Sequence, residues 1–213
     1  MCNHKVRAGL AIALLILFFG VGITGLAIPS SYSLFVKLTS LSLLLSICIL
    51  MLFHSEWKRR LVIFFLMVAI GGFLLEVIGV NTGMIFGEYT YGSLLGIQLW
   101  STPLLIGVNW LILIYTTWDM TGRIRMPVAL RILVSGILMV IFDFILEPAA
   151  TNMGLWTWSS TVIPIQNYLA WFIISILFFI LAARMRIELR NKISISLWLI
   201  LFTFFLLFRL LNI

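Results

Sequence analysis

Apolar stretches long enough to cross a bilayer follow one another along the chain, separated by short polar connections. A helix needs about 20 apolar residues to span the hydrocarbon core. Seven such stretches can be read, with approximate cores Ala8–Ile28, Leu34–Phe53, Leu61–Val80, Pro103–Trp118, Val128–Leu146, Gln166–Ala183 and Ile193–Leu211. The pattern predicts an all-α polytopic membrane protein of about seven transmembrane helices, with residues 1–213 forming one integral membrane domain.

Composition and charge agree with this interpretation. Of the 213 residues, 63% are hydrophobic and only 10% are charged, which excludes a soluble domain. Eleven basic residues lie in the N-terminal segment and in every second connection: Lys5, Arg7, Lys58, Arg59, Arg60, Arg123, Arg125, Arg184, Arg186, Arg190 and Lys192. The intervening connections, Pro29–Ser33, Asn81–Thr102 and Glu147–Ile165, contain no Lys or Arg. This positive-inside pattern predicts a cytoplasmic N-terminus and an external C-terminus, and it explains the net charge without a nucleic-acid partner.

One phrase occurs twice, as GEYTYG at 87–92 and GLWTWS at 154–159. Both read glycine, any residue, aromatic, threonine, aromatic, small residue. An acid stands eleven residues before each phrase, at Glu76 and Asp143, and a Pro-x6-Trp segment follows each one. The matched order of these features predicts an internal duplication.

The two repeats cover about 61–118 and 128–183, and each consists of a span, an outer loop and a returning span. Both start from the same side, so they are parallel repeats, which are related by a pseudo-twofold axis along the membrane normal. The axis is expected to bring the two outer loops together over a cavity between the third to sixth spans.

Three acids on the outer side are the candidate catalytic residues. Glu76 and Asp143 lie within spans, where an ionisable side chain marks a functional site by default. Asp143 and Glu147 are four residues apart and share a helix face, and Pro148 is expected to end that helix. Two carboxyl groups so close in an apolar setting cannot both ionise at low cost, so one neutral acid beside a carboxylate is expected. That pair suits general acid catalysis.

The remaining acids need less explanation. Glu56, Glu188 and Asp119 are expected to be solvated in or beside the basic loops. Whether Glu88 belongs to the site stays open. The alternative without a functional role is that the three candidate acids reach the membrane surface and titrate normally.

The aromatic residues of the repeats are candidate substrate-binding residues: Tyr89, Tyr91, Trp110, Trp156, Trp158 and Trp171. Aromatic residues of this kind serve as membrane-interface anchors, or their ring faces stabilise a cation. The amides of Asn109, Gln166 and Asn167 begin or line the returning spans, where they orient a water or an acid, or make ordinary interhelical hydrogen bonds. Acids and aromatic faces together predict a reaction in which an acid protonates a hydrophobic alkene and the ring faces shelter the carbocation that forms.

Two pairs of segments carry a resemblance to a known family. GEYTYG with TPLLIGVNW, and DFILEPAATNMGLWTW with IPIQNYLAW, resemble the carotenoid biosynthesis protein family, which includes carotenoid 1,2-hydratases and the archaeal hydratase of bacterioruberin synthesis. The resemblance runs from about Glu76 to Trp171. It implies hydration of a terminal double bond of a long polyene, in a bacterial or archaeal cytoplasmic membrane with lipid and other carotenoid-pathway enzymes as partners. No metal and no cofactor are expected, and Cys2 and Cys48 suggest no metal site or disulfide.

Several alternatives remain. Heterodimer-type lycopene cyclases have a similar plan but carry Pro-x-Glu-Glu, where this chain reads Pro103-Leu-Leu-Ile and Pro164-Ile-Gln-Asn, so cyclisation is disfavoured without being excluded. A transporter or binding protein for small hydrophobic molecules would need a polar route to both membrane faces. A retinal photoreceptor is set aside, because it would need a lysine in the last span and Ile193–Leu211 contains none. A prenyl-diphosphate transferase would need basic residues near its acids, and the outer loops have no Lys or Arg.

Overall fold

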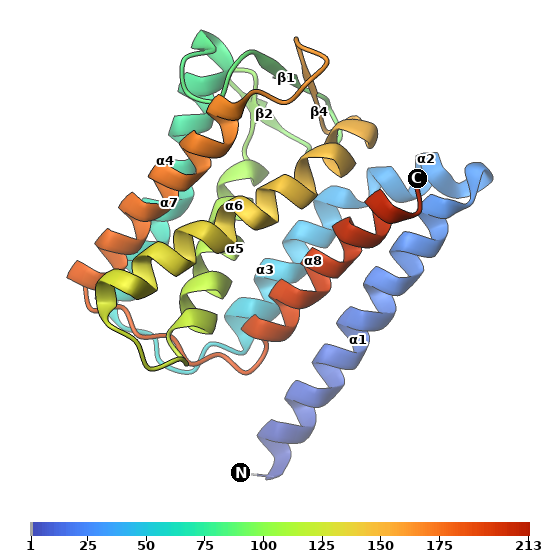
Figure 1. Ribbon diagram of the computed structural model, residues 1–213. Helices are drawn as coiled ribbons and strands as arrows, with labels where there is room; N and C mark the ends of the chain where they lie inside the picture. The colour runs from blue at the N-terminus through green and yellow to red at the C-terminus, as the bar shows by residue number, and fades with distance from the viewer. Residues whose placement is uncertain (1) are drawn as a thin grey trace.

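Helices follow the apolar stretches in the computed structural model, which describes residues 2–213, with side chains from Val6 onward. The side chains of Cys2 and Lys5 therefore lie outside the described residues. In chain order the helices and strands are α1 (Cys2–Ala27), α2 (Pro29–Lys37), α3 (Thr39–Leu52), α4 (Arg59–Thr82), β1 (Tyr89–Tyr91), β2 (Gln98–Leu99), β3 (Thr102–Pro103), α5 (Leu105–Thr121), α6 (Val128–Asn152), β4 (Trp156–Trp158), α7 (Ile165–Arg184) and α8 (Ser194–Leu210) (Figure 1).

The prediction of an all-α membrane protein is confirmed. Within the described residues, α1, α4, α6 and α7 are each long and apolar enough to cross a membrane. The bent pair of α2 and α3 would be a fifth such element. Two further helices, α5 and α8, have 17 residues each, and α8 is apolar.

The second apolar stretch is broken into two helices that meet at 50° around Leu38. Hydroxyl side chains compete with the helical hydrogen bonds at this point: Thr39 donates to the Val36 carbonyl at 2.7 Å, and Ser42 donates to the Thr39 carbonyl at 2.7 Å. Such side-chain bonds to nearby carbonyls bend helices. The break sets α2 at an angle and leaves α3 free to line the bundle.

Pro148 does not end α6, contrary to the sequence prediction, because the helix continues to Asn152. A proline inside a helix leaves the carbonyl four residues earlier without its usual donor. That carbonyl belongs to Phe144, and it accepts a hydrogen bond from Arg209 Nη1 of α8 at 3.3 Å. The Arg209 guanidinium also lies 4.9 Å from the Phe144 ring centre, so α8 stabilises the helix where proline weakens it.

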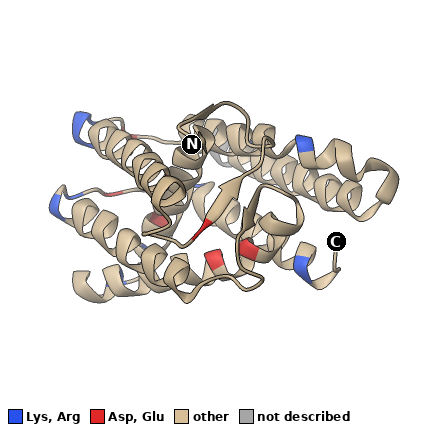
Figure 2. Ribbon diagram, turned by 90° about the horizontal axis from the view of Figure 1, so that it is seen from above, with Lys and Arg blue, Asp and Glu red and all other residues tan. Residues whose placement is uncertain are grey.

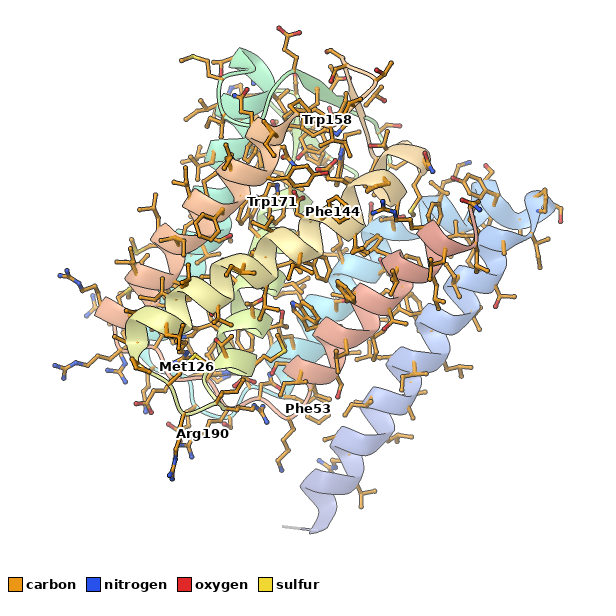
Figure 3. All side chains as sticks on the ribbon, viewed as in Figure 1. Phe53, Met126, Phe144, Trp158, Trp171 and Arg190 are labelled. Atoms are coloured by element: carbon orange, nitrogen blue, oxygen red, sulfur yellow. The ribbon has the colours of Figure 1, made fainter. Side chains whose placement is uncertain are left out.

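The helices pack as two hairpins with a lid of short strands. Helix α4 packs on α5, α6 packs on α7, and α8 lies against α1, α5 and α6. The strands β1 and β4 lie together over one end of the bundle, and α1 stands at its edge (Figure 1). The basic side chain of Arg190 lies at the other end of the bundle, near Phe53 and Met126 and far from Trp158 and Trp171 (Figure 3).

Close helix contacts depend on a few glycines. A Cβ atom on Gly72 would lie 2.7 Å from the Trp110 ring, and one on Gly107 would overlap the Ala69 carbonyl oxygen. Gly25 lies equally close to the Phe35 ring, whereas a Cβ on Gly20 would meet nothing within 4 Å. Gly25 and Gly72 therefore permit close packing, whereas Gly20 takes no part in a close contact.

Replacing Gly107 by alanine should separate α4 from α5, because the new methyl group has no room beside the backbone of α4. We expect Gly107→Ala to lower the free energy of unfolding by about 1–3 kcal/mol, as overpacking does. Gly20→Ala is the matched control and should be neutral or stabilising by up to about 1 kcal/mol. Thermal unfolding of both variants in detergent measures the difference, and equal melting temperatures would contradict this account of the α4–α5 contact.

Candidate functional site

Three carboxyl groups lie buried at the strand-covered end of the bundle. Glu76 of α4 is 4% exposed, and Asp143 and Glu147 of α6 are 0% and 3% exposed. Seen from above, acidic positions gather near the strands in the middle of the molecule, and most Lys and Arg lie toward its edges (Figure 2). The three groups are called the acid cluster below. Because a buried carboxyl group without partners is costly, its hydrogen bonds decide its chemistry.

Glu76 accepts hydrogen bonds on both of its oxygens. The hydroxyls of Tyr89 and Tyr91 donate to Oε2 at 2.5 and 2.8 Å, and Trp110 Nε1 donates to Oε1 at 2.9 Å. Gly72 and Gly79, one turn away on either side along α4, leave room for the Trp110 and Phe86 rings. Three donors on one carboxyl group favour its ionised form.

The two tyrosines remain donors in this arrangement. Burial, followed by the neighbouring Glu76 carboxylate, raises the pKa of Tyr91 well above its ordinary value of 10.0. The same two causes raise the pKa of Tyr89. Both phenols therefore keep their protons and bind the Glu76 carboxylate as fixed donors.

Glu147 and Asp143 share one amide. The indole Nε1 atoms of Trp156 and Trp158 donate to Glu147 Oε2 at 3.0 and 2.8 Å. Asn167 Nδ2 donates to Asp143 Oδ2 at 2.7 Å and reaches Glu147 Oε1 at 3.4 Å. The second oxygen of Asp143, Oδ1, has no hydrogen-bond partner among the described residues. Asp143 is thus the member of the acid cluster with the fewest donors.

The repeated phrases pair with each other to deliver these aromatic donors. β1 and β4 form an antiparallel ladder in which Tyr89 faces Trp158, Thr90 faces Thr157, and Tyr91 faces Trp156. Side chains alternate along a strand, so both aromatic residues of each phrase point the same way, toward the acids. The preceding glycines Gly87 and Gly154 have φ of 106° and 70°, which side-chain-bearing residues rarely adopt. The conformation explains why each phrase begins with glycine.

The two tryptophans that follow the phrases meet below the ladder. The rings of Trp110 and Trp171 stack with centroids 4.2 Å apart and planes 20° apart. The two ring faces therefore contact each other, and the nitrogen edge of Trp110 points at Glu76. Trp171 of α7 and Trp110 of α5 join the two helix hairpins.

Two predicted site amides make no hydrogen bond to the acid cluster. Gln166 is exposed and donates to the backbone carbonyl of Met84 at 2.6 Å, so it ties α7 to the loop after α4. Asn109 faces a cavity on the other side of α5. Glu88, left open by the sequence, is exposed.

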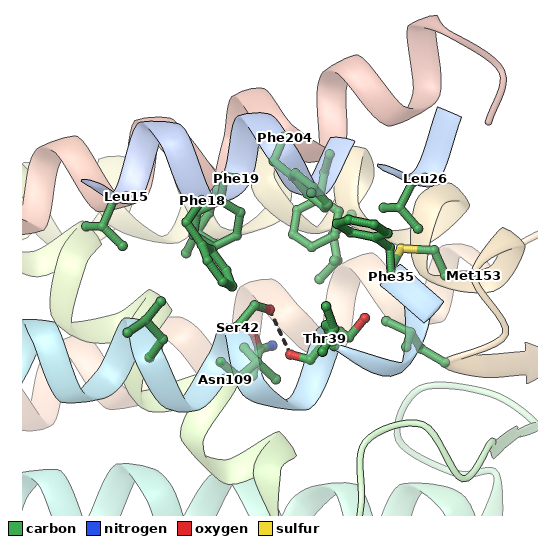
Figure 4. A pocket seen from close by; sticks show the side chains of 18 of the residues that line it. Leu15, Phe18, Phe19, Leu26, Phe35, Thr39, Ser42, Asn109, Met153 and Phe204 are labelled. Atoms are coloured by element: carbon green, nitrogen blue, oxygen red, sulfur yellow. Dashed lines mark hydrogen bonds between the residues drawn. The ribbon is translucent and has the colours of Figure 1, made fainter. Parts of the chain in front are cut away.

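A cavity of about 640 Å³ lies beside the acid cluster, but not between the third to sixth spans as the repeat had suggested. The acids and their aromatic donors fill that space. The cavity instead lies between α1, α3 and α8, with Asn109 of α5 and Phe142 and Leu146 of α6 on its inner wall (Figure 4). Trp156 belongs to both sites, because it lines the cavity and donates to Glu147.

Asp119 is not solvated, which corrects the sequence expectation. It is fully buried at the last turn of α5, where Oδ2 accepts hydrogen bonds from Arg123 Nη2 at 2.9 Å and from the Asn191 backbone at 3.2 Å, and also from Ser194. His54 and Asn191 both bond the Tyr115 hydroxyl nearby, at 2.7 and 3.1 Å. The i, i+4 spacing of Asp119 and Arg123 was the signal in the sequence that this acid has a fixed partner.

The acid cluster contains no such cation. The two ion pairs found among the described residues involve Glu56 and Asp119, so the three clustered carboxyl groups are held by neutral donors alone. No group of three or more His, Cys, Asp and Glu side chains in the described chain is placed to hold a metal ion. Carboxyl groups close together without a cation favour a shared proton. Asp143, with one donor and one unpartnered oxygen, is best placed to carry it.

Apolar spanning helices around a buried group of acids define a helical membrane protein with a polar centre at one end. Comparison with known proteins identifies its relatives. A model of the family described as carotenoid biosynthesis protein matches residues 35–213, and the chain belongs to this family. The chain is also similar to the bisanhydrobacterioruberin hydratase of Haloarcula japonica, with 27% identity over 110 residues. That match covers 46% of this chain and 36% of the relative, so the aligned part spans about a third of the relative's length. No solved structure matches the chain.

Removing the shared amide should weaken the acid cluster. We expect Asn167→Ala to lower the free energy of unfolding by about 1–3 kcal/mol, because Asp143 loses the one donor found for it in the described residues while it stays buried. Gln166→Ala, the neighbouring amide with an exposed side chain, is the matched control and should change stability by less than about 1 kcal/mol. Denaturant unfolding in detergent compares the two, and an equal effect would mean that Asn167 is not needed to hold the acids.

Proposed function

We propose that this protein hydrates a terminal double bond of a carotenoid, with Asp143 as the general acid. Three observations support the proposal: the family to which the chain belongs, its similarity to a protein named as a hydratase, and the arrangement of the acid cluster. The observation that carries the proposal is that the acid cluster lies next to an apolar cavity. Buried carboxyl groups lie directly behind the wall of an apolar cavity, and Trp156 belongs to both.

The proton donor follows from the hydrogen-bond inventory. Glu76 has three donors that stabilise its carboxylate, whereas Asp143 has one donor among the described residues and an unpartnered oxygen that can carry a proton. Asp143 transfers that proton to the terminal CH carbon of the alkene, the π bond breaks, and a tertiary cation forms beside the Asp143 carboxylate. Alkenes are weak bases, so a neutral acid held in a dry site is required.

Water completes the reaction. It adds through oxygen to the cation, and the proton that it releases returns to Asp143, so the product is a tertiary alcohol and the acid is regenerated. The ring faces of Tyr89, Tyr91, Trp156 and Trp158 stabilise the cation. The Glu76 carboxylate adds a fixed negative charge. Its oxygens already bind three donors, which favours this role over the positioning of water.

A substrate in the cavity reaches Asp143 only after a side chain moves, because Asp143 is fully buried. Trp156 lines the cavity and donates a hydrogen bond to Glu147. We propose that rotation of the Trp156 ring opens the wall, and that Glu147 and Asn167 keep Asp143 in position during this step. When Trp156 moves, the Trp158 indole still donates a hydrogen bond to Glu147.

Cyclisation begins with the same protonation and differs only in what captures the cation. The cavity offers a polar group for water, since the side chain of Asn109 lines it and makes no hydrogen bond to another described residue. That feature favours hydration over an internal double bond as the trap. The reaction is distinguished by mass, because hydration adds one water and cyclisation adds none.

We further propose the architecture that places this site on the outer side of a bacterial or archaeal cytoplasmic membrane. In it α1, the α2–α3 pair, α4, α5, α6, α7 and α8 are seven spans, with the N-terminus inside. Support comes from Lys58, Arg123 and Arg190 in loops at the end away from the strands.

The strand register supports the internal duplication. A twofold axis through the Thr90–Thr157 pair carries Tyr89 onto Trp156 and Tyr91 onto Trp158, as the repeat in the sequence requires. The stacked Trp110 and Trp171 obey the same relation. The acids are less symmetric, because Glu76 binds the aromatic residues of its own repeat whereas in the second repeat Glu147 does so, not Asp143.

Asp143→Asn keeps the shape of the side chain but cannot deliver a proton. In a host that accumulates an acyclic carotenoid, we expect the wild-type protein to yield a pigment heavier by one water, and the variant to reduce conversion by about 10²–10⁴-fold. Trp156→Leu should cost about 1–2 kcal/mol of transition-state stabilisation, roughly tenfold, because it removes one ring face. Pigment mass analysis at matched membrane levels of protein measures both.

Glu88→Gln is the control for this comparison, since it removes a carboxyl group from the same region at an exposed position. It should leave conversion unchanged. If Asp143→Asn and Glu76→Gln both converted pigment at the wild-type rate, the acids would be structural and the proposed mechanism would be wrong.

The proposed orientation predicts which loops an impermeant thiol reagent reaches. In a background without Cys2 and Cys48, cysteines placed at Ser93 and Ser159 should be labelled in intact cells, because both side chains are exposed beside the strands. A cysteine at Ser55, exposed at the opposite end, should be labelled only after the cells are opened. The reverse result would put the acid cluster on the cytoplasmic side.

A further inference from the structure

The cavity between α1, α3 and α8 is almost wholly apolar. Phe18, Phe19 and Phe204 supply aromatic walls, and the side chains of Asn109 and Ser42 are polar groups within it (Figure 4). Its volume of about 640 Å³ lies within the range of about 300–1,000 Å³ that is usual for small-molecule sites. Such a lining excludes charged ligands and suits a hydrocarbon.

One helical layer separates the cavity from the acid cluster. Two adjacent faces of α6 serve the two sites: Phe142 and Leu146 line the cavity, whereas Asp143 and Glu147 belong to the acid cluster. On α5, Asn109 lines the cavity and the next residue, Trp110, donates to Glu76. The cavity and the acids are therefore two sides of the same wall.

The cavity also opens sideways along α1. Leu14, Leu17 and Val21 line it, and they are 55%, 63% and 50% exposed on the surface of the bundle. Helix α1 packs on α2 and α8, and the cavity lies between it and α3 (Figure 4). In a bilayer this surface faces lipid, so a molecule dissolved in the membrane reaches the cavity without passing through water.

We propose that this cavity binds the end of an acyclic polyene that enters from the bilayer between α1 and α3. The inference rests on the proposed function for the identity of the occupant, a long isoprenoid hydrocarbon with a terminal double bond. The end group lies against Trp156, Phe142 and Leu146, one side chain away from the acids. The rest of the chain leaves past Leu14 and Leu17 into lipid, so the cavity need not hold the whole molecule. Asn109 and Ser42 bind the water consumed, or the hydroxyl group formed.

Two glycines of α1 test the proposal as a matched pair. Gly22 lines the cavity, and a Cβ atom there would meet the Phe204 ring at 3.5 Å, an ordinary contact, so a larger side chain would extend into the cavity. Gly20 has nothing within 4 Å and is exposed. Gly22→Phe therefore fills the cavity, whereas Gly20→Phe adds the same side chain to the lipid-facing surface of the same helix.

The experiment measures binding without turnover. Lycopene is titrated into lipid nanodiscs that contain each protein, and bound polyene is followed by the circular dichroism that an achiral chromophore acquires in a chiral site. We expect Gly22→Phe to weaken binding at least tenfold and Gly20→Phe to bind as the wild type does. Ser42→Leu, which fills the cavity from α3, should weaken binding as well, and it guards against a folding defect confined to α1.

Each outcome bears on the inference separately from the proposed function. Unchanged binding by Gly22→Phe and Ser42→Leu would overturn the inference, and so would a wild-type protein that retains phospholipid in the cavity and binds no lycopene. Asp143→Asn should bind lycopene normally while failing to convert it. If the wild-type protein bound a polyene in the cavity but formed no product from any acyclic carotenoid, the inference would stand and the proposed reaction would fall.

Discussion

The structure depends on the hydrogen bonding of three carboxyl groups inside an apolar bundle. Within a membrane, a carboxyl group cannot rely on water, so protein donors must satisfy it. Here the donors are the phenols and indoles of the two repeated phrases, the Trp110 indole of α5 and one amide, with no cation among the partners found in the described residues. This requirement explains why β1 and β4 pair directly over the helix ends: the pairing brings the aromatic donors of both phrases to the acids.

The same requirement shapes the helices around the acid cluster. Gly72 and Gly79 clear space beside Glu76 for large rings, and the strands start from glycines whose φ values few other residues accept. Pro148 is tolerated one residue after Glu147 because Arg209 supplies the donor that proline removes from the Phe144 carbonyl. A rigid acid cluster thus forms on one side of α6, while its other side faces an open cavity.

The bundle has a second polar centre at the end away from the strands, and the two centres differ in kind. Asp119 there is compensated by Arg123 and tied to Asn191 and Ser194, which joins the last turn of α5 to the start of α8. An acid with a cation partner and several donors is a structural fastening. Among the described residues Asp143 has no cation partner, and its Oδ1 has no hydrogen-bond partner; this contrast supports its proposed chemical role.

The sequence alone was enough to predict a helical membrane protein, the family, and the acids and aromatic residues of one polar centre, because bilayer thickness and the cost of buried charge leave a direct trace in residue order. It also revealed the repeated phrases. Tertiary structure decided what no spacing encodes: that the phrases pair with each other, that Asn167 joins Asp143 to Glu147 while its neighbour Gln166 points away, that Asp119 is buried, and that the cavity lies beside α1 instead of between the repeats. These outcomes depend on how large rings pack between helices that are distant in the sequence. The rings fill the space between the two repeats and leave a cavity between α1, α3 and α8.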